Sequence, residues 1–373
     1  MHTRFTVVAA LAVGITTSNS MAEIIEVCSD GCEYETIAAA LAAASSGDEI
    51  RIASGIYEEG GLGPENVGEL ALIGEVDEAG RPSTILKGTR FSCSNFILEL
   101  ENLVFEGDSK PSFPSAAAVG LFESSATITN CVFRDLYRTT GSGAAIYCDS
   151  PPDEIGLVLE DCEFHNNFAG GVGGAVNLIN GYDNTVEFND CVFRGNTAVE
   201  GGGAIYMTNL LPKKIAVPEA SIRGSTFVEN NVLFGTGSAI MTSYPITTIT
   251  SSIFIRNGCV DVSEDEEASF PIDGDYTDAG GNEIDLSCEE PDPVPGDLDG
   301  DGDFDEDDVY AGMKIFGITE GTPGDMDGDG DADEVDWQLL GIELGICLGD
   351  INGDGKVDAG DLGLLIGAWG LCP

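Results

Sequence analysis

Short segments in which polar and apolar positions alternate recur through the middle of the chain. Each segment ends in phenylalanine, and these phenylalanines follow one another at intervals of 28, 31, 29, 34 and 27 residues. The segments are Leu103-Val-Phe105, Cys131-Val-Phe133, Cys162-Glu-Phe164, Cys191-Val-Phe193, Ser225-Thr-Phe227 and Ser252-Ile-Phe254. Alternation with a period of two is typical of strands, and no helical period runs through this region. A repeat of about 30 residues with short strands predicts a β-solenoid.

Stacked coils bring equivalent residues into columns along the axis. The expected inward ladder consists of Phe133, Phe164, Phe193, Phe227 and Phe254. A second expected column contains small buried fillers, because free cysteine packs as a small apolar residue. Its members are Cys131, Cys162, Cys191, Ser225 and Ser252. We expect these three cysteines to be fillers rather than disulfide partners.

Two further elements alternate with the phenylalanines. The first is a glycine-led segment that predicts a tight corner in each coil. It occurs as Gly143-Ala-Ala-Ile146, Gly173-Gly-Ala-Val176, Gly202-Gly-Ala-Ile205 and Gly237-Ser-Ala-Ile240. Asparagine follows phenylalanine by three in four coils, and we expect it at turns, where it can hydrogen-bond the main chain and tolerates left-handed geometry. These residues are Asn167, Asn196, Asn230 and Asn257.

The start of the chain supports the same architecture. Residues 34–44 predict a helix, which is followed by Ser46-Gly-Asp-Glu-Ile-Arg-Ile52 and Gly55-Ile-Tyr57. The repeats resemble those of right-handed parallel β-helices of the pectin-lyase-like class, and the G-G-A-[IV] and F-x-x-N elements resemble the repeats of polymorphic outer-membrane proteins. This resemblance implies a mostly β protein, a right-handed parallel β-helix over residues 23–288. The helix would then cap the open end of its core.

The last quarter of the chain contains three aspartate-rich loops that begin at Asp297, Asp325 and Asp350. Each has an oxygen side chain at positions 1, 3, 5, 9 and 12 and glycine at position 6, which is the ligand spacing of an EF-hand calcium loop. Position 7 would bind Ca2+ through its backbone carbonyl. The predicted ligands are Asp297, Asp299, Asp301, Asp303, Asp305, Asp308, Asp325, Asp327, Asp329, Asp331, Asp333, Asp336, Asp350, Asn352, Asp354, Lys356, Asp358 and Asp361.

Apolar residues at helical spacing follow each loop, without a clear helix before it. This arrangement resembles a type I dockerin and implies a small α-helical calcium-binding domain over residues 296–373, with a cohesin-like partner or a cell-surface assembly. The sequence departs from the type I dockerin pattern in two ways. It has three loops, where dockerins usually have two segments, and it lacks Ser/Thr at loop positions 10 and 11. These departures put the cohesin partner in doubt. Residues 289–295 are proline-rich and predict a linker.

Residues 1–22 combine a short cationic start, an apolar run and small residues near Ala22, which predicts a secretory signal peptide. The apolar run is too short for a membrane span. The formal net charge of −51 makes nucleic acid and anionic membranes unfavourable partners. Eleven cysteines in an exported chain suggest some disulfides, and Cys28/Cys32, Cys259/Cys288 and Cys347/Cys372 are candidate pairs.

Two functional interpretations remain open. In the first, an exported calcium-binding protein uses its β-helix as a binding or structural surface for polysaccharide or a cell surface, and the dockerin-like module mediates docking. In the alternative, the chain is a dockerin-bearing polysaccharide lyase or glycoside hydrolase. No catalytic constellation is recognisable, which favours the first. Arg134 and Arg194 follow ladder phenylalanines with His165 between them, so they could form a basic strip for an acidic glycan. Arg256 follows its phenylalanine by two.

Overall fold

The computed structural model of the protein divides the chain into two units at Cys288. Most of the first unit is described: residues 22–64, 68–77, 79–107, 116–149, 151, 155–180, 185–209, 219–244, 246–259 and 270–288. The second unit, residues 289–373, lies outside the described residues.

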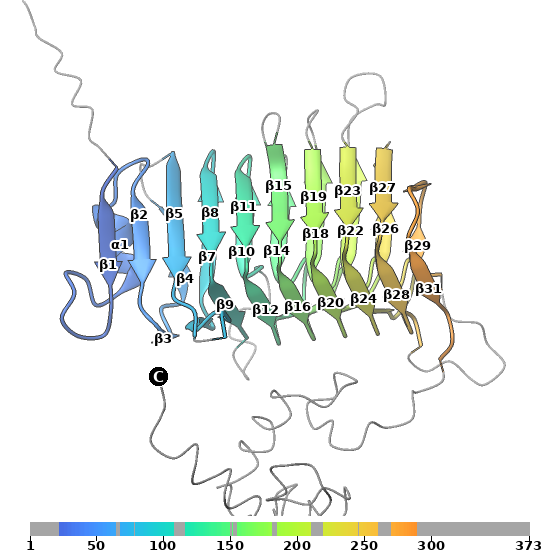
Figure 1. The fold of residues 1–373 in the computed structure, drawn as a ribbon, viewed down its shortest axis with the longest axis horizontal. Coiled ribbons are helices and arrows are strands. Elements are labelled where there is room, and N and C mark those ends of the chain that lie inside the picture. The colour runs from blue at the N-terminus through green and yellow to red at the C-terminus, as the bar shows by residue number, and fades with distance from the viewer. Residues whose placement is uncertain are drawn as a thin grey trace, which may run out of the picture. The chain divides into compact units, whose positions relative to one another are not determined.

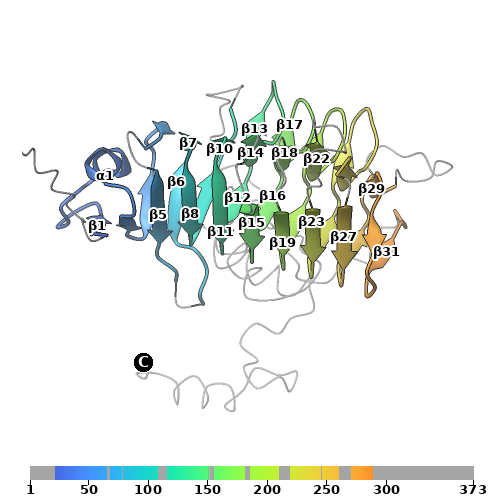
Figure 2. The same ribbon diagram turned by 90° about the horizontal axis from the view of Figure 1, so that it is seen from above.

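The described residues form a parallel β-helix in which the strands of successive coils lie side by side (Figures 1 and 2). We number its sheets I to IV. Sheet I contains β1 (Ile24–Val27), β2 (Glu49–Ile52), β5 (Glu69–Gly74), β8 (Ile97–Glu101), β11 (Ser125–Thr129), β15 (Ile155–Glu160), β19 (Thr185–Asn189), β23 (Glu219–Arg223), β27 (Ile246–Thr250) and β30 (Thr277–Asp278). Sheet II contains β3 (Gly55–Tyr57), β6 (Thr84–Lys87), β9 (Leu103–Glu106), β12 (Val132–Arg134), β16 (Glu163–His165), β20 (Val192–Arg194), β24 (Thr226–Val228), β28 (Ile253–Ile255) and β31 (Glu283–Asp285).

The other two sheets complete the coils. Sheet III contains β4 (Gly61–Leu62), β7 (Arg90–Ser94), β10 (Val119–Phe122), β14 (Ile146–Asp149), β18 (Val176–Asn180), β22 (Ile205–Asn209), β26 (Ile240–Thr242) and β29 (Ile272–Asp273). Sheet IV is short and contains β13 (Tyr137–Arg138), β17 (Phe168–Ala169), β21 (Thr197–Ala198) and β25 (Asn231–Val232). Neighbouring strands pair in parallel, so each residue lies beside its equivalent in the next coil.

The inward ladder predicted from the sequence is confirmed, and Phe105 extends it by one coil. Neighbouring rings stack with centroids 4.6–4.9 Å apart and planes within 2–3° of parallel. All six side chains are buried. This spacing is close to the ~4.8 Å separation of neighbouring strands, so the backbone register itself brings the rings into contact.

The cysteine predictions for the described residues are confirmed. Cys131, Cys162 and Cys191 are buried free thiols, and the backbone N–H of Cys191 donates to the hydroxyl of Ser225, 3.2 Å away. The disulfides Cys28–Cys32 and Cys259–Cys288 are both present. Cys347 and Cys372 lie outside the described residues.

The four predicted asparagines hydrogen-bond the main chain, but they do not have left-handed backbone. They are buried and form an amide ladder, in which the Nδ2 of each donates to a phenylalanine carbonyl at 2.8–2.9 Å. The left-handed residue is the one that precedes each asparagine. These residues are Asn166, Gly195, Glu229 and Arg256. The backbone reverses one residue earlier than expected, which lets the amide point into the coil.

The first coil is covered by α1 (Ile37–Ala43), which is shorter than the predicted helix. Its N-cap is Thr36, whose side chain accepts a hydrogen bond from the backbone of Ala39. Glu59 accepts hydrogen bonds from the backbone N–H groups of Ile37 and Ala38 at 2.7 and 2.8 Å. The buried face of α1 packs on the end of the core, as the sequence predicts.

Candidate functional site

The outer face of sheet II carries an unusual column of basic residues. In each strand the residue before this column points into the core, so the column itself faces outward. The strand register places five residues of successive coils next to one another, in the order Lys87, Glu106, Arg134, His165 and Arg194. We call these five residues the basic column. The predicted juxtaposition of Arg134, His165 and Arg194 is therefore present, and His165 is the last residue of β16.

Glu106 holds the first part of the basic column together. Its carboxylate lies 3.0 Å from Lys87 Nζ and 2.6 Å from Arg134 Nη2. Partial burial raises the pKa of Glu106, but the hydrogen bonds and positive charges of Arg134 and Lys87 outweigh that effect, so its pKa lies below the ordinary value. One carboxylate thus orients two cations whose side chains remain more than a third exposed.

His165 lies at the centre of the basic column and is held by a carboxylate on its own strand. Its Nε2 is 2.8 Å from Glu163 Oε2. The hydrogen bond from His165 lowers the pKa of the Glu163 carboxyl group. About a quarter of the His165 side chain is exposed. The imidazole is therefore fixed in orientation and still accessible from outside.

A second column on the same face is largely aliphatic. Strand register places Val104, Val132, Glu163, Val192 and Thr226 beside one another. Val132 and Val192 are half-buried. The face therefore offers cations next to two half-buried valines, with the exposed carboxylate of Glu163 between the valines. This combination suits an extended ligand that carries both carboxylates and C–H surface.

Sheet I presents the opposite charge. Glu49, Glu99 and Glu187 occupy one outward column of its register, in which the uncharged residues Ala71, Thr127 and Val158 lie between them. A cavity of about 540 Å³ lies on this face and is lined by acidic residues, among them Glu23, Asp48, Glu49, Glu69 and Glu99. Because charges farther apart than ~8 Å are largely screened at physiological salt, an anionic ligand responds mainly to the local surface. It would avoid sheet I and favour sheet II.

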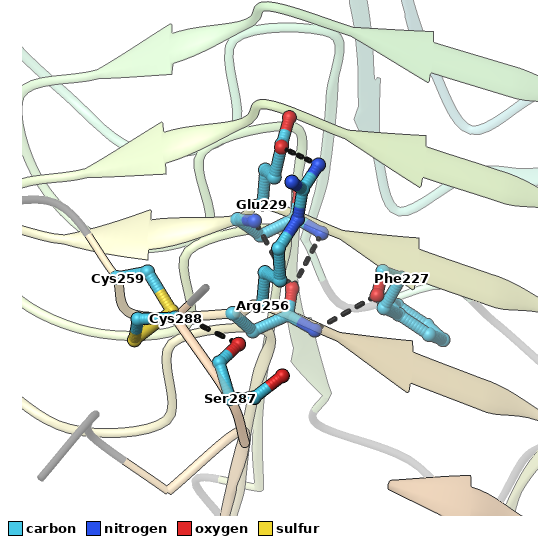
Figure 3. Close-up of polar contacts among 8 residues, drawn as sticks. Phe227, Glu229, Arg256, Cys259, Ser287 and Cys288 are labelled. Atoms are coloured by element: carbon cyan, nitrogen blue, oxygen red, sulfur yellow. Dashed lines mark hydrogen bonds and ion pairs between the residues drawn. A yellow bond between two sulfur atoms is a disulfide. The ribbon is translucent and has the colours of Figure 1, made fainter. Parts of the chain in front are cut away.

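Arg256 does not belong to the basic column. Ile255 occupies the register position next to Val228, and Arg256 is the left-handed residue beyond the strand. Its guanidinium pairs with Glu229 of the preceding coil, as Figure 3 shows, close to the Cys259–Cys288 disulfide. Arg256 therefore has a structural role at the last coils.

The 18 predicted calcium ligands, Asp297 to Asp361, lie outside the described residues. Within the ranges that the structure describes, no group of three or more His, Cys, Asp or Glu side chains could hold a metal ion. In the same ranges, no helix has the length and apolarity needed to cross a membrane.

Sequence reasoning did not include Lys87 and Glu106 in the basic column. Glu106 directly follows Phe105, just as Arg134 and Arg194 follow their phenylalanines. The repeat alignment could therefore have placed Glu106 in the same column. Lys87 follows Leu86, which takes the place of the phenylalanine in that coil. Because this coil lacks the phenylalanine that marks the repeat, the sequence does not align Lys87 with the column.

Comparison with known proteins gives a match to one repeat. The repeat of the Chlamydia polymorphic membrane proteins matches residues 190–208, which include β20 and β21. No curated protein matches the chain. Among solved structures, the crystal structure of the pectin methylesterase from Aspergillus niger is 14% identical, with a TM-score of 0.41, over 71% of this chain and 85% of that chain. The structure itself thus defines a parallel β-helix protein, in which one coil carries a polymorphic-membrane-protein-like repeat.

Proposed function

We propose that this is an exported protein, secreted or held at a cell surface, whose β-helix binds an acidic polysaccharide along the outer face of sheet II. In this proposal residues 296–373 bind Ca2+ through the three aspartate loops and dock the protein to a partner, either cohesin-like or part of a cell-surface assembly. The observation that carries the binding proposal is the basic column on an otherwise strongly acidic chain.

The geometry of the basic column supports a linear polyanion. The column contains three cations along the axis, Lys87, Arg134 and Arg194. It contains one carboxylate, that of Glu106. Successive positions are separated by the strand spacing of ~4.8 Å. A chain of uronate units that lies along the axis could contact several of these cations at once. Arginine can bind a carboxylate through two parallel hydrogen bonds.

Equilibrium binding of the intact protein to polygalacturonate tests this proposal. We expect Arg134→Gln combined with Arg194→Gln to weaken binding about 2- to 30-fold, from roughly 0.2–1 kcal/mol for each exposed ion pair. The matched control is Arg51→Gln with Arg223→Gln, which removes the same charge from sheet I. Equal loss of affinity in the two double variants would show that the basic column is not the binding site.

A second candidate is cleavage of the polysaccharide by a lyase or hydrolase. The observation that favours it is the His165–Glu163 pair beside Arg134, since an imidazole and a carboxylate can serve as acid and base. Incubation with uronate polysaccharides and Ca2+, followed by measurement of reducing ends and of unsaturated uronates, tests this candidate. Product that disappears in His165→Gln would establish it, and absence of product would leave binding alone.

A further inference from the structure

Sheet IV carries an aromatic pair on its outer surface. Tyr137 and Phe168 are equivalent residues of β13 and β17, and their rings stack with centroids 5.4 Å apart and planes 19° from parallel. Tyr137 is 59% exposed, whereas the stacked phenylalanines of the inward ladder are buried. The pair is therefore a surface feature and not an extension of the core.

The fold does not require aromatic residues at this position. In the next two coils, the same register position is occupied by Thr197 and Asn231. These polar residues form the same short strands and pair in the same way. Exposed aromatic surface is unfavourable in water, and the two stacked rings of adjacent coils form a small apolar patch that the fold does not require.

The aromatic pair lies in the same coils as the centre of the basic column. Tyr137 follows Arg134 by three residues, and Phe168 follows His165 by three. Three residues of extended chain span at most about 10 Å, and the intervening left-handed residue shortens that path. Stacked coils keep both features parallel to the axis. A ligand on the basic column could therefore reach both rings around the corner between sheets II and IV.

We propose that Tyr137 and Phe168 form a stacking platform for the pyranose rings of the polysaccharide. This inference rests on the proposed function and adds a second subsite to it. The negative face of an aromatic ring attracts the partially positive C–H groups of a sugar ring, and stacking also removes apolar surface from water. The basic column would bind the carboxylates, and the platform would bind the uncharged faces of neighbouring sugar units.

Two polymers separate the platform from the basic column. Polygalacturonate carries carboxylates, and its fully methyl-esterified form keeps the sugar rings without the charge. The test variant is Tyr137→Thr with Phe168→Thr, because threonine occupies this position in the following coil. The control is Tyr276→Thr, another exposed tyrosine, near β30. Circular dichroism and thermal unfolding of each intact variant verify that the fold is retained.

We expect the double threonine variant to bind both polymers more weakly, about 2- to 10-fold for each lost ring. Arg134→Gln with Arg194→Gln should weaken only the binding of the charged polymer. A folded threonine variant that binds both polymers like wild type overturns the platform alone. Wild-type binding to the esterified polymer only would overturn the basic column and leave the platform. Failure of wild type to bind either polymer overturns both.

Discussion

Replacement of Asn196 by alanine would interrupt the amide ladder at its centre. Oδ1 of Asn196 accepts hydrogen bonds from the backbone N–H and the Nδ2 of Asn167, at 3.1 and 2.9 Å. Its own Nδ2 donates to the carbonyl of Phe164 at 2.8 Å and to Oδ1 of Asn230 at 2.9 Å. Asn196 has no exposed surface, so water cannot replace these partners.

The cost follows from the groups left without a partner. Alanine removes the acceptor of the Asn167 backbone N–H and the acceptor of one Nδ2 hydrogen of Asn167. Each buried polar group without a partner costs about 1–3 kcal/mol, so these two groups predict a loss of about 2–6 kcal/mol in the free energy of unfolding. Loss of one of the donors to the Phe164 carbonyl adds to this value, and ladder cooperativity would increase it further.

The assay is chemical unfolding together with amide hydrogen exchange. We expect a lower unfolding midpoint and exchange at Asn167 at least about tenfold faster, since 1.4 kcal/mol corresponds to a factor of ten. The matched control is Asn189→Ala, which removes an amide from the outer face of sheet I and should change stability by less than about 0.5 kcal/mol. If Asn196→Ala unfolds like this control, the ladder does not stabilise the coils.

Three further predictions concern other parts of the chain. Gly174→Ala should destabilise the fold by about 1–3 kcal/mol in urea unfolding, because a Cβ would lie 2.0 Å from the Gly203 carbonyl oxygen, whereas Gly61→Ala, which meets nothing within 4 Å, should be neutral. Burial raises the pKa of the Cys93 thiol from 9.0 to about 11. The buried thiol therefore contributes its full stabilisation of the folded state below pH 9, and this contribution to the free energy of unfolding falls as the pH rises towards 11. Unfolding measurements on wild type and Cys93→Ala should therefore converge across that range, and parallel curves would contradict the assignment. Isothermal calorimetry should detect Ca2+ uptake by wild type and its loss in the Asp297→Ala, Asp325→Ala and Asp350→Ala triple variant, and unchanged uptake would refute the loop assignment.

Much of the β-helix could be predicted because its stacking forces equivalent residues into columns. Phe133 and Phe164 reveal the period, and the inward position of one fixes that of the other. The cysteine column follows by the same logic. The conformation around Asn167 could not be predicted, because asparagine suits both a left-handed turn and a buried amide ladder. Only the backbone angles and the hydrogen bonds show that Asn166 reverses the chain and that Asn167 points inward.

The candidate site was harder to predict than the fold. The spacing of Arg134, His165 and Arg194 places them in one column once the coils are aligned. Their partners Glu106 and Glu163 depend on side-chain directions, which a period does not contain. The stacked pair Tyr137–Phe168 was also missed, because aromatic residues occur in only two coils at that position and produce no repeat signal.

Ligand protection of individual arginines shows which face of the β-helix binds the polysaccharide. Modification of arginine side chains by phenylglyoxal, read by mass spectrometry, can be compared with and without an oligogalacturonate. We predict several-fold slower modification of Arg134 and Arg194 in the presence of the ligand, with Arg51 and Arg223 on sheet I unchanged. Protection of the sheet I arginines, or equal modification of all four with the ligand bound, would contradict the assignment of sheet II as the binding face.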